Sequence, residues 1–253
     1  MKVKNIYKVE EERGVASTLV AKEVVPAYNE QVAKFLTDNQ SRFGDKWVKN
    51  TASKLYIFGE NKDGELVGSS TYGGLAMATF LPEVSLIRGR ELLELQKNSG
   101  DKTPLGSVYI DFGVQVNGNP KNNKAQAEAL QADYKTRGFS KKEIYVPDFS
   151  QLRLNADDNG NLVAKLADDT EEKDLTPLSA YDFCHAGNNG LFWACLNNVG
   201  NWDACYDDLS NSDDFGRVVR YDAAGVEPKK IESQTSELVS ELGSQFLGKF
   251  KLD

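Results

Sequence analysis

Two stretches of this chain have the pattern of a strand, a tight turn and a second strand. In residues 54–70 (KLYIFGENKDGELVGSS), the Asp63-Gly64 dipeptide separates two apolar runs. In residues 150–169 (SQLRLNADDNGNLVAKLADD), the segment DDNGN lies between two such runs. Dipeptides of this kind between strands are the usual signal of a β-hairpin. The sequence therefore predicts antiparallel strands.

The remaining periodicity adds further strands and two or three helices. Strands are predicted within residues 3–25, 107–120 and 142–149, and helices within residues 27–43, 81–100 and 119–138. No strand-helix-strand unit repeats, which favours an α+β fold over a doubly wound sheet. We expect one domain over residues 1–226, followed by a C-terminal amphipathic helix in residues 227–253.

The charge balance excludes several classes of partner. The formal net charge is −8, and no block of Lys or Arg opposes it, so binding to nucleic acid is disfavoured. No signal peptide and no apolar run of about 18 residues is visible, so membrane insertion is not expected. The sequence leaves the location open between the cell interior, a virion and display through a partner.

Residues with catalytic or metal-binding chemistry are few. Cys184, Cys195 and Cys205 follow one another at spacings of 11 and 10, which match no zinc or redox pattern. The single histidine, His185, directly follows Cys184, and neighbouring side chains of an extended segment point to opposite faces. Sequence signatures of phosphate-binding loops, metalloproteases and serine hydrolases are absent. We therefore expect no enzyme activity, no metal site and no cofactor.

A short segment with two adjacent glycines allows two interpretations. TYGGLA, residues 71–76, could let backbone approach a ligand, or it could form a tight turn or bulge. We favour the turn.

The composition changes abruptly near the C-terminal end. Lys, Glu, Gln and Met make up 51 of the 253 residues, yet none of them occurs in the 53 residues from Asp174 to Val226. Ordinary compositional scatter does not produce such a gap. Within residues 190–219, small and apolar residues recur at intervals, whereas Cys, Asn, Asp, Tyr, Val, Ser and Phe fill the positions between them. The first group is typical of a structural frame.

The filling residues share a property of their codons. Each is reached from an Asn codon by changing the first two adenines and keeping the final pyrimidine, whereas Lys, Glu, Gln and Met are not. The chain resembles the variable proteins of archaeal diversity-generating retroelements. The resemblance rests on this codon pattern in NGLFWACLNNVGNWDACYDDLSNSDDFGRVV and on three upstream segments, TYGGLA, SVYIDFGVQVNGNPKNNKAQAEALQ and VPDFSQLRLNADD. The resemblance covers about residues 41–229.

The resemblance implies a C-type-lectin-like fold with a ligand-binding function. In that family, adenine-directed mutagenic reverse transcription rewrites a segment whose side chains gather on one solvent-facing surface. Carried over by position, the expected ligand-binding residues are Trp193, Cys195, Asn197, Asn198, Val199, Asn201, Asp203, Cys205, Tyr206, Asp207, Asp208, Ser210, Asn211, Asp213, Asp214 and Phe215. The expected frame residues include Leu191, Phe192, Ala194, Leu196, Trp202 and Leu209.

The expected ligand is a protein or a surface that is basic or rich in hydrogen-bond donors. This expectation rests on the aspartates of the segment, which would surround aromatic anchors such as Tyr206 and Phe215. Two other functions stay open. One is an enzyme that uses Cys184, His185 or the aspartates, or that resembles the formylglycine-generating enzymes of the same fold. The other is an assembly protein that associates through the C-terminal helix.

Overall fold

The computed structural model describes residues 15–19, 24–60, 66–98, 109–140, 142–181, 183, 189–197, 200–204, 208–210, 216–217 and 219–223. The predicted C-terminal helix in residues 227–253 lies outside these ranges. Within them, the chain mixes helices with small, mostly antiparallel sheets, as the α+β prediction required. None of the described helices is long and apolar enough to cross a bilayer.

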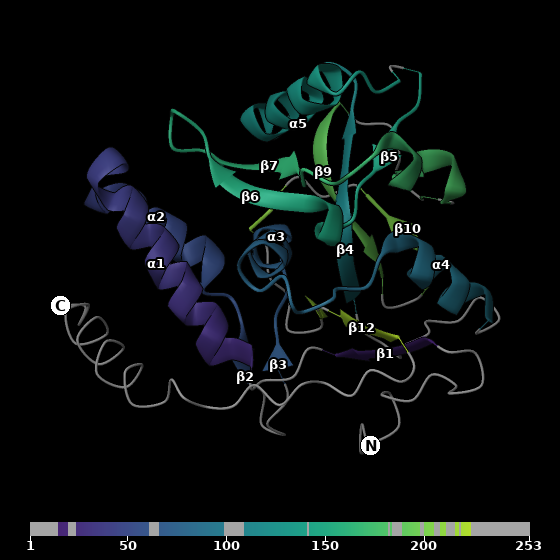
Figure 1. Ribbon diagram of the computed structural model, residues 1–253, viewed down its shortest axis with the longest axis horizontal. Coiled ribbons are helices and arrows are strands. Elements are labelled where there is room, and N and C mark those ends of the chain that lie inside the picture. The colour runs from purple at the N-terminus through teal and green to yellow at the C-terminus, as the bar shows by residue number, and fades with distance from the viewer. Residues whose placement is uncertain are drawn as a thin grey trace.

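Five α-helices occur in the part of the chain that the structure describes, rather than two or three. They are α1 (Val25–Phe43), α2 (Asp45–Leu55), α3 (Thr71–Phe80), α4 (Gly89–Asn98) and α5 (Lys124–Thr136). Figure 1 shows α1 and α2 at one side of the molecule and α4 at the opposite side. The predictions for 27–43 and 119–138 are confirmed by α1 and α5.

Helix α4 begins later than the sequence predicted. The predicted range of 81–100 contains Pro82, and the chain there is irregular up to Arg88. The Glu91 carboxylate accepts a hydrogen bond from the backbone N–H of Arg88 at 2.8 Å. This bond satisfies a backbone donor just before the first turn and places the start of the helix at Gly89.

Helix α3 corrects the prediction of a turn at TYGGLA. The Ser70 side chain accepts a hydrogen bond from the Gly73 N–H at 3.1 Å and caps the helix. A Cβ atom on Gly73 would lie 2.2 Å from Ile57 Cδ1, and one on Gly74 would lie 2.2 Å from Phe149 Cε2. The two glycines therefore let neighbouring side chains approach a helix that is buried over most of its length.

The largest sheet has the order β10-β9-β4-β11. Strand β4 (Tyr109–Asn117) pairs antiparallel with β9 (Gly190–Leu196), and β9 pairs antiparallel with β10 (Trp202–Asp203). Strand β11 (Gly216–Arg217) is parallel to β4, a pairing that the prediction of antiparallel strands did not include. A bulge in β4 lies between Asp111 and Gly113. A Cβ atom on Gly113 would lie 2.3 Å from the Pro147 carbonyl oxygen, so this position requires glycine.

Within the described ranges, four antiparallel strand pairs lie outside this sheet. Strand β1 (Val15–Leu19) pairs with β12 (Val219–Ala223), and β5 (Tyr145–Val146) pairs with β8 (Thr176–Pro177). Both predicted hairpin pairings are confirmed, because β2 (Gly59–Glu60) pairs with β3 (Leu66–Val67) and β6 (Leu152–Ala156) pairs with β7 (Leu162–Leu166). Asp63 and Gly64 lie outside the described residues.

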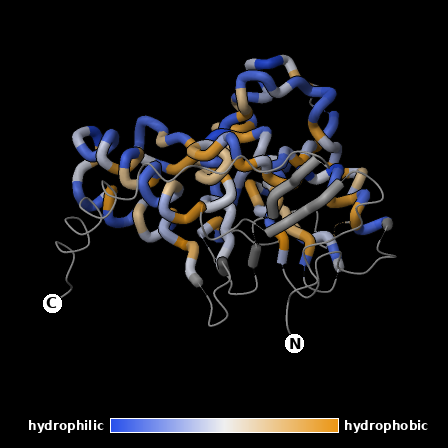
Figure 2. Tube along the Cα trace, turned by 60° about the horizontal axis from the view of Figure 1, so that its bottom comes forward, coloured by the Kyte–Doolittle hydropathy of each residue, from blue (hydrophilic) through white to orange (hydrophobic). Residues whose placement is uncertain are grey.

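Both faces of the β4–β9 pair are covered. On one face, Val114, Leu191 and Trp193 belong to a large apolar cluster with residues of α1, α3 and α5. On the other face, Ile110, Ala194 and Leu196 belong to a second cluster with residues of α4. Figure 2 shows hydrophobic segments gathered inside the fold and hydrophilic segments along its outer turns. The pair therefore forms the centre of the core.

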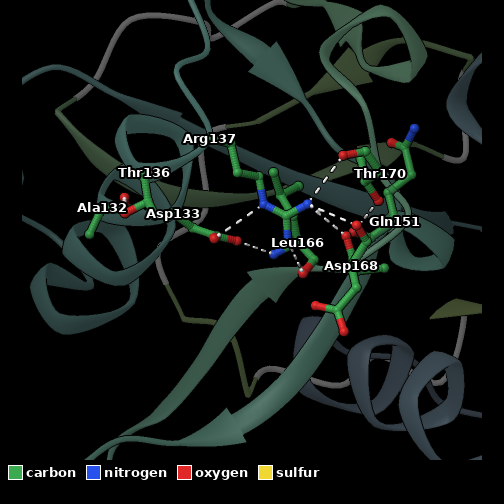
Figure 3. A network of polar contacts seen from close by, with 9 residues as sticks. Ala132, Asp133, Thr136, Arg137, Gln151, Leu166, Asp168 and Thr170 are labelled. Carbon is green, nitrogen blue, oxygen red and sulfur yellow. Dashed lines mark hydrogen bonds and ion pairs between the residues drawn. The ribbon is translucent and has the colours of Figure 1, made fainter.

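Arg137, just after α5, ties that helix to the end of β7 (Figure 3). Its guanidinium group donates to the carbonyl oxygens of Leu166 at 3.0 Å, Ala167 at 2.9 Å and Thr170 at 3.2 Å. Asp133 accepts from Arg137 Nε at 3.3 Å and from the Leu166 N–H at 2.7 Å. These bonds satisfy backbone groups at the point where the sheet ends.

Candidate recognition site

The predicted frame of the recognition segment, residues 190–219, is buried wherever the structure describes it. The exposed fraction is at most 4% for Leu191, Phe192, Ala194, Leu196, Trp202, Ala204 and Leu209. Strand β9 lies between β4 and β10, and each of its residues is buried. The prediction that these side chains form the frame is confirmed.

Three of the expected ligand-binding residues are buried instead of solvent-facing. The exposed fraction is 7% for Trp193, 0% for Cys195 and 8% for Asp203. Alternate side chains of a strand point to opposite faces, and apolar clusters cover both faces of the β4–β9 pair. The prediction that these three side chains form part of an accessible surface is wrong for this structure.

The turn between β9 and β10 carries two accessible positions of the predicted set. Asn201 is exposed and Asn197 is half-buried. The Asn201 N–H donates to Asn197 Oδ1 and the Asn197 N–H donates to the Asn201 carbonyl oxygen, both at 2.9 Å. Gly200 has φ +86°, a conformation that favours glycine. These bonds hold the two ends of the turn together, and Asn201 is exposed.

Another accessible position of the predicted set is Asp208. Its Oδ1 atom accepts hydrogen bonds from the Ser210 N–H at 3.0 Å and from the Ser210 hydroxyl at 2.7 Å. Leu209, between them, is buried, and its carbonyl oxygen accepts from the Tyr72 N–H of α3 at 3.2 Å. Burial raises the pKa of Tyr72 to about 12, and the charge of Asp208 acts in the same direction. Residues 208–210 are therefore attached to α3 with Asp208 on the outside.

Helix α4 supports this part of the sheet from its other face. Gln96 accepts from Trp202 Nε1 at 2.7 Å and donates to the Gly200 carbonyl oxygen at 2.6 Å. The Trp202 ring packs edge-on against Phe112 and Tyr181. One glutamine side chain therefore holds both the turn and the strand that follows it.

The structure also brings together a buried polar row that the sequence analysis did not identify. Asp111 pairs with Cys195 across β4 and β9, and Cys195 pairs with Asp203 across β9 and β10. Directly opposed residues have Cβ atoms about 5 Å apart. The Ser69 hydroxyl, just before α3, donates to the Asp111 carboxylate. The available signal was an aspartate inside the apolar strand YIDFGVQV.

The other expected ligand-binding residues lie outside the described residues. They are Asn198, Val199, Cys205, Tyr206, Asp207, Asn211, Asp213, Asp214 and Phe215. Cys184 and His185, the candidate catalytic pair, also lie outside them. Among the residues that the structure does describe, no group of three or more His, Cys, Asp and Glu side chains is arranged to hold a metal ion.

Comparisons with protein-family models, with curated protein sequences and with solved structures find no match.

Proposed function

We propose that this protein is a variable ligand-recognition protein with a C-type-lectin-like fold, whose segment 190–219 is diversified by adenine-directed mutagenic reverse transcription. The observation that carries the proposal is the 53-residue run without Lys, Glu, Gln or Met. Mutation of adenines in Asn codons explains the residues that fill segment 190–219 and why Lys, Glu, Gln and Met are absent from it. No requirement of packing excludes those four amino acids from exposed positions.

The division between buried frame and accessible turn supports the proposal. A buried large side chain costs about 2–5 kcal/mol to truncate, whereas an exposed change usually costs about 0.5 kcal/mol or less. Leu191, Leu196 and Leu209 are buried, while Asn201 and Asp208 are exposed. Diversification at the second group leaves the fold intact. Recognition is therefore centred on the β9–β10 turn and on residues 208–210.

The buried positions of the segment act on recognition indirectly. Cys195 and Asp203 contribute to the buried row beside Asp111, below the β9–β10 turn. A change of volume or charge at either position shifts the packing that supports this turn. Direct contact with ligand is assigned to the accessible side chains.

The charge of the accessible side chains defines the class of ligand. Asp208 is exposed, and the protein as a whole carries a net charge of −8. A basic or donor-rich protein surface is the complementary partner, and its association should weaken as salt is raised.

The coding DNA provides the decisive test. Mutagenic retrohoming requires a near-copy of the segment that encodes residues 190–219, close to a reverse transcriptase gene. The two copies should differ at positions where the template has adenine, and the codons of Leu191, Leu196 and Leu209 should be identical in both. A flanking region with neither a second copy nor a reverse transcriptase gene would overturn the proposal.

A further inference from the structure

A cavity of about 260 Å³ lies between the end of α3, the irregular segment 81–88 and the start of β6. Its apolar lining comes from Ala78, Pro82, Val84 and Leu86. Its polar lining comes from Ser85, Arg88, Ser150 and Arg153. A cavity with one apolar part and two guanidinium groups is complementary to a small amphipathic anion.

Arg153 is held with one edge of its guanidinium group unused. Both N–H bonds of Nη1 are directed to backbone carbonyl oxygens, that of Ser150 at 2.9 Å and that of Leu152 at 2.7 Å. Among the residues that the structure describes, no acceptor lies within hydrogen-bond distance of its Nε or Nη2, and no carboxylate pairs with it. The Nε–Nη2 edge presents two parallel N–H donors, which match the two oxygens of a carboxylate.

Arg88 makes a different contribution. Its guanidinium group pairs with the Glu91 carboxylate, and the Glu91 side chain is only 6% exposed. Arg88 is therefore largely neutralised within the protein. Arg153 supplies the charge that is left for a ligand, while Ser85, which is exposed, lies at the accessible side of the cavity.

We propose that this cavity binds a small carboxylic acid, with the carboxylate on the Nε–Nη2 edge of Arg153 and a short branched or cyclic apolar body against Ala78, Val84 and Leu86. The volume is below the range of about 300–1,000 Å³ that is typical for drug-sized ligands. A body of a few carbon atoms is therefore the appropriate size. For such an acid we expect a Kd of about 1 mM or tighter.

This site is independent of the proposed diversification. None of the residues that line the cavity belongs to segment 190–219. If that segment varies, each variant keeps the same acid-binding site. If it does not vary, the site is unaffected.

The test uses the full-length chain and isothermal titration with 4-methylpentanoate. Two matched probes separate the contributions: 4-methylpentanamide keeps the body and removes the charge, and inorganic phosphate keeps the charge and removes the body. We expect the acid to bind at least 10-fold more tightly than either probe. Equal binding of the amide or of phosphate would overturn the carboxylate assignment, and so would no binding of the acid at 10 mM.

Three variants locate the site. Arg153→Lys keeps the charge but loses the paired donors, so its affinity for the acid should fall about 10-fold. Ser85→Trp leaves Arg153 in place and should block entry to the cavity with a larger side chain. Because Ser85 is exposed, this variant should fold and provides a test even if Arg153→Lys folds poorly. Arg42→Lys, on the exposed Arg42–Asp158 ion pair, is the control and should bind as the parent does. Unchanged binding in both Arg153→Lys and Ser85→Trp would place the acid elsewhere and refute the proposal.

Discussion

At the residue scale, the core contains polar side chains that the hydrophobic pattern did not reveal. Gln115 is fully buried within β4, and neither polar atom of its amide has a hydrogen-bond partner among the described residues. Burial of an amide without hydrogen bonds costs free energy of folding. Gln126, by contrast, donates to the Tyr72 hydroxyl at 3.1 Å and to the Leu162 carbonyl oxygen at 3.0 Å.

The two glutamines should respond in opposite directions to the same substitution. Gln115→Leu removes the unpaired amide, so the free energy of unfolding should rise by about 1 kcal/mol. Gln126→Leu removes two hydrogen bonds and should lower it by about 1–2 kcal/mol. Urea denaturation followed by tryptophan fluorescence measures both. A loss of stability in Gln115→Leu would contradict the account of Gln115 as an uncompensated group.

Asp148 is a buried acid whose ionisation is linked to folding. Burial raises its pKa to about 6, against an ordinary value of 3.8, although the hydrogen bond from Ser150 acts in the opposite direction. The folded state thus binds the proton more tightly than the unfolded state. The resulting stability is fully present below the ordinary pKa and is lost as the pH rises through about 6.

The pH dependence of stability should therefore depend on this side chain. Between pH 4 and pH 7, the Asp148 carboxyl should reduce the free energy of unfolding by on the order of 2–3 kcal/mol. Asp148→Asn keeps the side-chain acceptor and should flatten the profile by that amount. Denaturation midpoints over this pH range make the comparison, and parallel profiles for the parent and Asp148→Asn would show that Asp148 does not titrate there.

At the element scale, the sequence predicted elements with a strong local signal. The hairpin pairings, α1, β4 and α5 follow from turn dipeptides and periodicity. Helix α3 was not predicted, because glycine has a low helix propensity, and the packing of Ile57 and Phe149 against Gly73 and Gly74 is a tertiary property. The structure shows a cap at Ser70, but one cap residue does not outweigh the low helix propensity of two glycines.

The attachment of α5 to the β6–β7 hairpin should depend on the hydrogen bonds that the Arg137 guanidinium group donates. Its side chain is 20% exposed and serves several backbone carbonyl oxygens. Arg137→Met leaves these oxygens without their donor and should lower the free energy of unfolding by about 2–3 kcal/mol. Arg137→Lys should recover only part of this loss. Arg42→Lys, at an exposed ion pair, is the control and should change the free energy of unfolding by less than about 0.5 kcal/mol. An equally small change for Arg137→Met would refute the role of the Arg137 hydrogen bonds.

At the scale of the whole molecule, the sequence predicted the frame of the candidate site better than its accessible surface. Leu191, Leu196 and Trp202 are apolar in a regular pattern, and the core includes them. The burial of Cys195 and Asp203 depends on α3 and on the cover of both sheet faces, which no local pattern contains. A codon pattern identifies positions that can change, but only the packing determines which of them reach solvent.

Substitutions at exposed, buried variable and frame positions of segment 190–219 should therefore have unequal costs. Asn201→Tyr, at the exposed turn, should change the free energy of unfolding by about 0.5 kcal/mol or less. Cys195→Tyr inserts a large ring at a fully buried position and should cost about 1–3 kcal/mol or more. Leu196→Ala, in the frame, should cost about 2–5 kcal/mol. The midpoints of urea denaturation rank the three variants by stability. If Cys195→Tyr left the free energy of unfolding unchanged, this face of β9 would be open in solution.

Strand β4 anchors both flanks of the recognition segment. Leu196 and Arg217 pair with the same residue, Ile110, from its two sides, so their backbones lie about 10 Å apart. The chain therefore leaves the sheet on one side of Ile110 and rejoins it on the other. A substitution at an exposed position such as Asn201 or Asp208 should therefore leave the separation of the two flanks unchanged.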